Sequence, residues 1–250
     1  MQLPNQEDDD STFLKGIQQR VALSIENNGL FIDLSTDSCR KFLQRKVNSN
    51  ANIVVMYVDI AGSTQMSRDI SPANLSLIIQ IFSQEISLAV VKFGGYVLKF
   101  VGDAVIALFP SDFNPNQAIQ HSLECATHIQ ETITKGVNPI FRQHSLGEIA
   151  IKIGIEYGSA LVILYGKNIN HAHIDLIGFS ISIAAKITSV AYPNEIVVGE
   201  NAYNNIDSSL KKSLVTLYYN NSKWTSTMKF NNNLSYRIYK YTKEQNKKNN

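Results

Sequence analysis

Two aspartates that follow apolar stretches have the residue type and spacing of a metal site. Asp59 comes directly after Ile53–Val58, and Asp103 lies in the turn Gly102-Asp103 between two apolar runs. Neighbouring carboxylates repel each other and resist burial unless a cation compensates them. Mg²⁺ favours one or two carboxylates with waters and substrate phosphates, and two such ions can clamp both oxygens of a displacement at phosphorus. Either aspartate alone would be a turn or capping residue, but together they predict a two-metal site.

A loop of small residues follows Asp59. It contains Gly62, Ser63 and Thr64 and leads toward a helix. Backbone N–H groups in such a loop can approach a phosphate closely because no bulky side chain intervenes. These three residues are therefore candidate substrate-binding residues.

Strands are expected to position both aspartates. Tyr96–Phe109 is rich in β-branched and aromatic residues around Gly102-Asp103, which is a two-residue hairpin signal. Ile53–Val58 is apolar at consecutive positions, which predicts a central strand buried on both faces. The order from Asn52 onward is β-α-β-β-α-β, the ferredoxin-like α+β pattern, followed by extra strands. That order brings Asp59 and Asp103 together at one edge of the sheet.

Helix start and stop signals give the remaining elements. Ser71-Pro72 and Asn114-Pro115 are expected to begin two amphipathic helices, ended by Gly94-Gly95 and by Gly136. The further expected elements are strands at Ile149–Ile155 and Ala160–Tyr165 with Gly158 at their turn, a helix at Phe179–Val190, a strand at Glu195–Val198, and an antiparallel pair at Leu214–Tyr219 and Tyr236–Tyr241.

Composition narrows the class of protein. The chain has 250 residues, 44% of them hydrophobic, and a net charge of +2, which is too small to indicate a nucleic acid or an anionic membrane as partner. No uninterrupted apolar run reaches the ~18 residues of a membrane span, and the polar N-terminus does not resemble a signal peptide. Cys39 and Cys125 make neither a disulfide framework nor a metal site, so we expect free thiols and a cytoplasmic protein.

Four motifs carry a resemblance to the class III nucleotidyl cyclase catalytic domain. The first two, Val58–Thr64 and Lys99–Phe109, are together quite specific, and Ile151–Gly158 and Asp175–Gly178 continue the match. The similarity covers roughly residues 52–200. It implies conversion of a nucleoside triphosphate to its 3′,5′-cyclic monophosphate with release of pyrophosphate. The resemblance also implies two Mg²⁺ or Mn²⁺ ions per site, and a site shared by two domains, here a head-to-tail homodimer.

The resemblance assigns roles residue by residue. Asp59 and Asp103 match the metal-binding aspartates, and Ile60 matches the residue whose carbonyl also binds metal. Lys99 and Asp175 match the pair that reads adenine. Adenine offers an acceptor at N1 beside its 6-amino donor, whereas guanine has the opposite polarity. Lysine only donates and an ionised aspartate only accepts, so guanine would be disfavoured by roughly 2–5 kcal/mol. A surface lysine and a helix-capping aspartate are the alternative interpretations.

Two positions depart from the family. Ser182 stands where the family has an asparagine that orients the ribose, and Lys186 stands where it has an arginine that stabilises phosphate charge. Serine is shorter, and lysine lacks the bidentate fork of arginine. Both are candidate catalytic residues, although a small polar helix residue and a solvated cation are also possible readings. Lys223 and Lys229 are candidates for the lysine that contacts the triphosphate.

The interpretation that follows is an adenylate cyclase that uses ATP. The alternative is a catalytically weak cyclase-homology module that binds nucleotide or a partner and regulates. A diguanylate cyclase is disfavoured because its G-G-[DE]-E-F turn is replaced by V-G-D-A-V. Short helices after Asp10-Ser11 and Asp37-Ser38 are expected before the core, and the first ten residues are expected to be disordered. The expected division is an extension or linker at 1–50, a catalytic domain at 51–242 and a disordered tail at 243–250.

Overall fold

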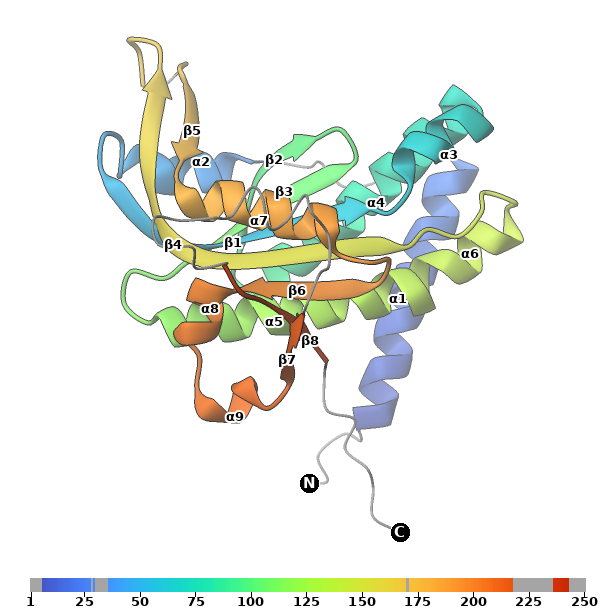
Figure 1. Ribbon diagram of the computed structural model, residues 1–250. Coiled ribbons are helices and arrows are strands. Elements are labelled where there is room, and N and C mark those ends of the chain that lie inside the picture. Colours follow the sequence, from blue (N-terminus) through green and yellow to red (C-terminus); the bar gives the residue numbers. More distant parts are fainter. Residues whose placement is uncertain (1–5, 28, 30–35, 170, 218–235, 243–250) are drawn as a thin grey trace, which may run out of the picture.

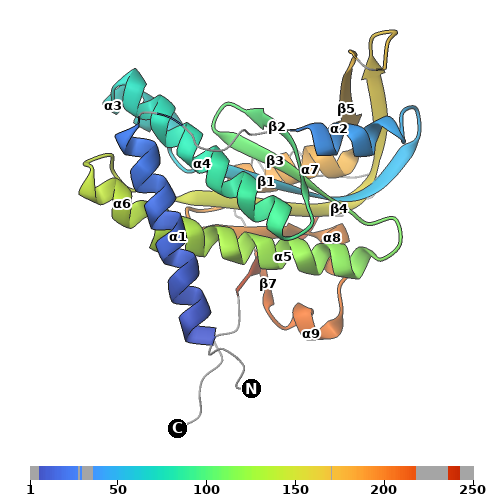
Figure 2. The ribbon, with the colours of Figure 1, turned by 180° about the vertical axis from the view of Figure 1, so that it is seen from behind.

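The structure is a computed structural model that describes residues 6–27, 29, 36–169, 171–217 and 236–242. In this part of the chain an eight-stranded sheet carries helices on both faces, as Figures 1 and 2 show from opposite sides. The helices are α1 (Gln6–Glu26), α2 (Asp37–Gln44), α3 (Ser63–Asp69), α4 (Pro72–Lys92), α5 (Pro115–Glu131), the π-helix η1 (Thr132–Val137), α6 (Asn138–Gln143), α7 (Phe179–Val190), α8 (Glu200–Asn204) and α9 (Ser208–Lys211). The strands are β1 (Asn50–Ile60), β2 (Tyr96–Val101), β3 (Ala104–Pro110), β4 (Ile151–Tyr165), β5 (His173–Ile177), β6 (Glu195–Gly199), β7 (Leu214–Leu217) and β8 (Ile238–Tyr241).

Strand β1 lies inside the sheet, between β3 and β4. The strand order is β2-β3-β1-β4-β6-β8-β7, with β5 paired to the far end of β4. Val54, Met56 and Val58 pack into the core beneath α4 and α5, while Ile53 and Val55 pack into the core beneath α2 and α7. This alternation confirms the predicted strand buried on both faces, and the strand order confirms the predicted ferredoxin-like α+β fold.

The two long helices begin at the predicted caps. Ser71 Oγ accepts a hydrogen bond from Asn74 N–H, and Pro72 occupies the first turn of α4. Asn114 caps α5 in the same way. Each cap satisfies a backbone donor that the first helical turn leaves without an intrahelical partner. The cap at Ser71 fixes the residue at which α4 begins. Helix α4 leads directly to β2, the first strand of the hairpin, and so helps to position it.

Helix α4 is also long and apolar enough, by length and composition alone, to cross a membrane. The sequence has no uninterrupted apolar run of that length because Gln80, Gln84 and Glu85 lie among the apolar residues. More than half of the stretch is buried within the described part of the protein, where Ile78, Phe82 and Ile86 pack into the core. A buried core helix passes the same test of length and composition.

Gly158 does not form the predicted turn. Strand β4 continues through it for 15 residues and pairs with β1 from Ile60↔Ile151 to Asn50↔Leu161. A Cβ on Gly158 would lie 3.1 Å from Cβ of Ser180 on α7. The glycine therefore permits close packing of α7 on β4, and that contact between distant segments left no local signal in the sequence.

Gly136 likewise does not end a helix. The chain continues from α5 through the π-helix η1 into α6. A Cβ on Gly136 would lie 2.7 Å from Cγ2 of Ile17, so the glycine makes room for α1. Here too, a tertiary contact explains a glycine that the sequence presented as a stop signal.

The N-terminal extension contains a helix that packs on the core. Helix α1 begins at Gln6, so the prediction of disorder is wrong for residues 6–10. Ile17 and Val21 of α1 belong to the main core, and Figure 2 shows α1 crossing the helical segment where α5 continues into α6. Helix α2 begins where predicted and buries Cys39 and Leu43. The predicted disordered tail, 243–250, lies outside the described residues.

Candidate active site

The fold brings Asp59 and Asp103 together, as predicted. Strands β1 and β3 are antiparallel with Asp59 opposite Ala104, the residue after Asp103 in the hairpin. Burial, then the charge of Asp103 and a hydrogen bond to it, raise the pKa of Asp59 to about 6. Atom Oδ2 of Asp103 is buried and has no hydrogen-bond partner. The two carboxylates thus form a half-buried acidic pair whose charge is incompletely compensated.

A divalent cation fits this pair. Among the described residues no group of three or more His, Cys, Asp or Glu side chains could hold a metal. The donors here would be the two carboxylates and the backbone carbonyl of Ile60, the buried last residue of β1. A small set of hard oxygen donors suits Mg²⁺ or Mn²⁺, which complete their coordination with waters and substrate phosphates.

The structure adds Lys152, a residue that the sequence analysis missed. It lies on β4 in direct register with Asp59 of β1. Its charge lowers the pKa of Asp59, which partly opposes the larger effects of burial and of Asp103. Lys152 is the single charged residue within the apolar run Ile151–Ile155, and that interruption was the signal available in the sequence. Lys152 Nζ also donates to the Ser189 carbonyl at 3.5 Å, so the acidic pair has one cation beside it that is bonded toward α7.

The predicted small-residue loop follows β1 directly. Gly62 has φ +78° and precedes α3, which begins at Ser63 rather than several residues later. The left-handed conformation favours glycine there, because a side chain at that φ would be strained. Gly62 and Thr64 are exposed and Ser63 is half-buried. All three lie within four residues of Ile60, the last residue of β1, which directly follows Asp59.

Lys99 and Asp175 form the pair that the resemblance implied. Lys99 Nζ donates to Asp175 Oδ1 at 2.8 Å and to Oδ2 at 2.6 Å. Burial alone would raise the pKa of Asp175, but hydrogen bonds from Lys99 and from Leu176 N–H, with the Lys99 charge, hold it below its usual value. A register shift in β2 between Val97 and Lys99 sets Lys99 opposite Ile106. The bulge thus aims Lys99 at β5 and leaves Leu98 in the core.

Ser182 and Lys186 lie on α7, four residues apart and both exposed. Ser182 Oγ donates to the carbonyl of Gly178 at 3.3 Å. Within the described residues, neither side chain forms a hydrogen bond or ion pair with Asp59 or Asp103. The chain therefore presents them on one helix face without joining them to its own acidic pair. The candidate lysines Lys223 and Lys229 lie outside the described residues.

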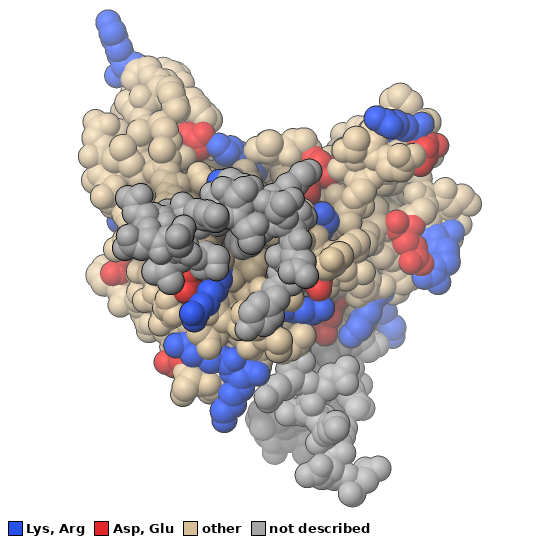
Figure 3. Space-filling model, viewed as in Figure 1, with Lys and Arg blue, Asp and Glu red and all other residues tan. Residues whose placement is uncertain are grey.

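A surface notch separates the part of the molecule that carries Asp175 from the part that carries α3. In Figure 3 it lies between the β4–β5 hairpin and α3, and acidic and basic side chains both appear along it. Strand β5 carries Asp175 on one side, and β1 leads to α3 on the other. The mixed charges suit a ligand that needs both a cation-binding and an anion-binding group.

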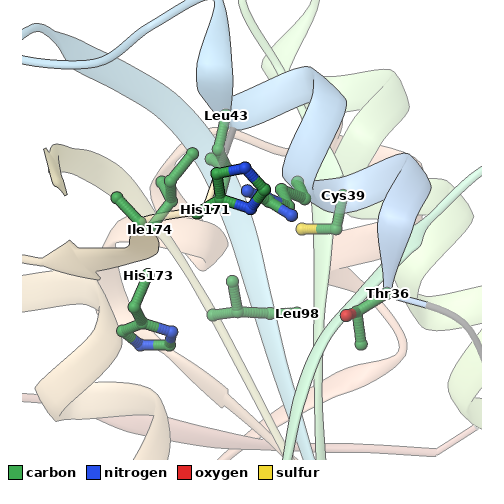
Figure 4. A pocket seen from close by; sticks show the side chains of 9 residues that line it. Thr36, Cys39, Leu43, Leu98, His171, His173 and Ile174 are labelled. Carbon is green, nitrogen blue, oxygen red and sulfur yellow. The ribbon is translucent and has the colours of Figure 1, made fainter. Parts of the chain in front are cut away.

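A separate cavity of about 290 Å³ lies between α2, β2 and the start of β5. Figure 4 shows Cys39 and Leu43 of α2 on one side and His171, His173 and Ile174 on another. Burial raises the pKa of the Cys39 thiol to about 12, so Cys39 is a neutral lining group at physiological pH. Leu98 and Ile174, which line the cavity, directly precede Lys99 and Asp175 in the sequence. Lys99 and Asp175 themselves do not line the cavity.

Comparisons with known proteins identify the family. The family model of the adenylate and guanylate cyclase catalytic domain matches residues 46–223. A cytidylate cyclase from Escherichia coli is 28% identical over 162 residues, which are 60% of this chain and 34% of that protein. The chain thus spans about a third of the length of that relative.

Solved structures share the fold. The adenylyl cyclase CyaB from P. aeruginosa superposes with a TM-score of 0.64 at 18% identity, covering 79% of this chain and 97% of that one. A class III adenylyl cyclase-like ATP-binding protein from Pseudomonas aeruginosa has a TM-score of 0.60 at 18% identity, covering 66% and 37%. With its acidic pair, its ion pair and a family match over well over half of its length, this chain belongs to the adenylate and guanylate cyclase catalytic domain family.

Proposed function

We propose that this chain is an adenylate cyclase that converts ATP to 3′,5′-cyclic AMP and pyrophosphate. The observation that carries the proposal is the presence of both half-sites in one chain: the Asp59–Asp103 pair and the Lys99–Asp175 pair. The first fits metal-bound phosphates and the second fits a nucleobase. A domain kept only as a scaffold would have no need for either arrangement of charged groups.

The reaction needs few protein groups. The 3′-oxygen of the ribose forms a bond to the α-phosphorus, the bond to the bridging oxygen breaks, and pyrophosphate leaves with the electron pair while the hydroxyl proton passes to solvent. Mg²⁺ or Mn²⁺, two per site, supplies Lewis-acid stabilisation of the attacking and phosphate oxygens when bound. Asp59, Asp103 and the Ile60 carbonyl would hold the metals, and Gly62, Ser63 and Thr64 would offer backbone N–H groups to the phosphates.

The positive side chains would stabilise charge on the phosphates. Lys152, opposite Asp59, is placed to bind a phosphate oxygen that reaches the acidic pair. Lys186 supplies an ammonium to the transition state, and the Ser182 hydroxyl orients the ribose. Fixed charges aimed at developing negative charge are among the larger contributions to catalysis.

We also propose that the site is completed by a second copy of the chain in a head-to-tail homodimer. Exposed apolar residues surround the two half-sites: Val101 beside the hairpin turn, Ile177 beside Asp175, and Phe179 at the start of α7. Their side chains are 41–55% exposed. Apolar groups exposed around a polar site indicate a surface that another chain covers.

The alternative function is a catalytically weak module that binds nucleotide or a partner. Ser182 and Lys186 favour it, because both are weaker than the asparagine and arginine they replace. Nucleotide binding would then be retained, since the metal and base groups are intact, while turnover would be slow or absent.

One assay separates these functions. Purified protein is incubated with ATP and Mn²⁺, and the products are resolved by chromatography, with Asp103→Asn as the matched control. We expect cyclic AMP and pyrophosphate in equal amounts from the wild type and none from the variant. Nucleotide binding without product would assign the chain to the regulatory alternative.

A further inference from the structure

The Lys99–Asp175 pair is held in one arrangement of donors and acceptors. Lys99 Nζ donates to both Asp175 oxygens, and Leu176 N–H donates to Oδ1 at 2.8 Å. All three hydrogen bonds need an acceptor carboxylate, so Asp175 offers only acceptors and Lys99 only donors. The Lys99 and Asp175 side chains are 34% and 20% exposed, so a ligand can still reach them.

Nucleobases fall into two classes at the edge that such a pair reads. Adenine and cytosine carry an exocyclic amino donor beside a ring-nitrogen acceptor. Guanine and uracil carry an exocyclic carbonyl acceptor beside a ring N–H. A purine and a pyrimidine of the same class thus present the same polarity, although they differ in size.

We infer that the Lys99–Asp175 pair selects bases with an exocyclic amino group, so that the site accepts CTP as well as ATP and rejects GTP and UTP. The inference rests on the proposed function, because it needs Lys99 to face the ring nitrogen and Asp175 to face the amino group. It goes beyond an adenine site by making the amino group, and not the purine, the recognised feature.

The groups around the pair support selection by polarity and not by ring size. Among the described residues, Leu176 N–H is the backbone donor bonded to Asp175, and His173 Nε2 lies 3.7 Å from Asp175 Oδ2. The Leu176 N–H is already bonded to the carboxylate. A histidine ring can present either a donor or an acceptor, so it does not separate adenine from cytosine.

Binding of four 3′-deoxynucleoside triphosphates tests the inference without turnover, since these analogues lack the attacking hydroxyl. With Mn²⁺ present, the adenine and cytosine analogues should bind about 10–100-fold more tightly than the guanine and uracil analogues, as expected for mismatched charged hydrogen bonds. A guanine or uracil analogue that binds as tightly as the cytosine analogue would overturn the inference.

A variant tests the role of the carboxylate. In Asp175→Asn the amide can rotate to present either its oxygen or its NH₂ group, so the preference for amino bases should shrink to about threefold or less. Asp112→Asn is the control, because Asp112 forms an ion pair of similar exposure with Lys46 at 2.7 Å. An unchanged preference in Asp175→Asn would contradict the assignment.

Turnover of ATP, CTP, GTP and UTP then separates the two claims. If no cyclic product forms from any of them but the binding order holds, the proposed cyclase activity fails and the base selection stands. If ATP is cyclised while CTP binds no better than UTP, the base selection fails and the cyclase stands.

Discussion

Lys99 and Asp175 are 76 residues apart in the sequence and are joined by an ion pair with a 2.6 Å Nζ–Oδ2 distance. Lys99 belongs to β2, where the bulge at Leu98 turns the lysine side chain toward Asp175. Asp175 belongs to β5. The pair spans strands that are not neighbours in the sheet, so its geometry depends on the whole curved assembly of β2, β3, β1, β4 and β5.

Reversing the polarity of this pair should reverse the base preference. In Lys99→Glu with Asp175→Ser, the position that donated becomes an acceptor, which matches the ring N–H of guanine. We expect the ratio of kcat/KM for ATP over GTP to fall by about 100-fold. The same change at the control ion pair, Lys46→Glu with Asp112→Ser, should leave the ratio unaltered. A wild type that already uses both nucleotides equally well would refute the role of the pair.

Restoring the residues of the family on α7 should raise turnover. Only interactions stronger in the transition state than in the ground state speed the chemical step, and a forked guanidinium meets growing phosphate charge better than an ammonium. Ser182→Asn with Lys186→Arg should increase kcat by roughly tenfold, with KM changed little. Steady-state kinetics with Lys135→Arg, an exposed lysine on η1, gives the control. A double variant no faster than wild type would mean that other residues have these roles.

A buried carboxylate outside the Asp59–Asp103 pair should make stability depend on pH. Glu156 on β4 is fully buried, accepts hydrogen bonds from Tyr157 N–H, Ala202 N–H and the Tyr236 hydroxyl, and leaves no room for a side chain at Gly199. Burial, only partly opposed by these hydrogen bonds, raises its pKa from 4.5 to about 7. The folded state therefore binds this proton more tightly than the unfolded chain, and stability present below pH 4.5 is lost as the pH rises through about 7.

Glu156→Gln should remove this part of the pH dependence, because glutamine resembles the protonated acid. Between pH 5 and 8 the free energy of unfolding should fall by about 2–3 kcal/mol more in the wild type than in the variant. Urea unfolding at several pH values measures the difference. The pKa of Asp59 also lies in this range. Both proteins retain Asp59, so its contribution cancels when they are compared. Parallel curves for the two proteins would contradict the shifted pKa.

The docking of α1 gives a prediction about stability alone. Arg20 Nη2 lies 2.7 Å from Glu85 Oε2, and the Glu85 side chain is 1% exposed. Arg20→Met would leave that carboxylate buried without its cation, so we expect a loss of about 3 kcal/mol. Arg142→Met is the matched control, since its pair with Glu148 is largely exposed and should contribute less than about 1 kcal/mol. Equal unfolding midpoints in urea for the two variants would count against the buried pair.

Short sequence patterns predicted the elements whose structure depends on residues close together in the chain. The apolar run of β1, the Gly102-Asp103 turn and the proline-flanked caps of α4 and α5 were all readable, and with them the meeting of Asp59 and Asp103. Gly158 and Gly136 were misread because their reasons are contacts with Ser180 and Ile17, which are remote in sequence.

The residues of the candidate site also divide into those that the sequence predicted and those that only the structure shows. Motif residues predicted the Asp59–Asp103 pair and the Lys99–Asp175 ion pair. Lys152 was missed because its position opposite Asp59 appears only when β4 is placed in register with β1. The roles of Ser182 and Lys186 stay predictions, since in the described structure both face outward from α7.

Mixing two inactive variants tests the central claim most directly. Asp59→Ala removes the metal half and Lys99→Ala removes the base half, so each homodimer should lack cyclase activity. After subunit exchange, half of the dimers would carry one intact site of two, and about a quarter of wild-type activity should return. Differently tagged chains that co-purify would show that exchange has occurred. Exchange without any return of activity would contradict a site shared between two copies of this chain.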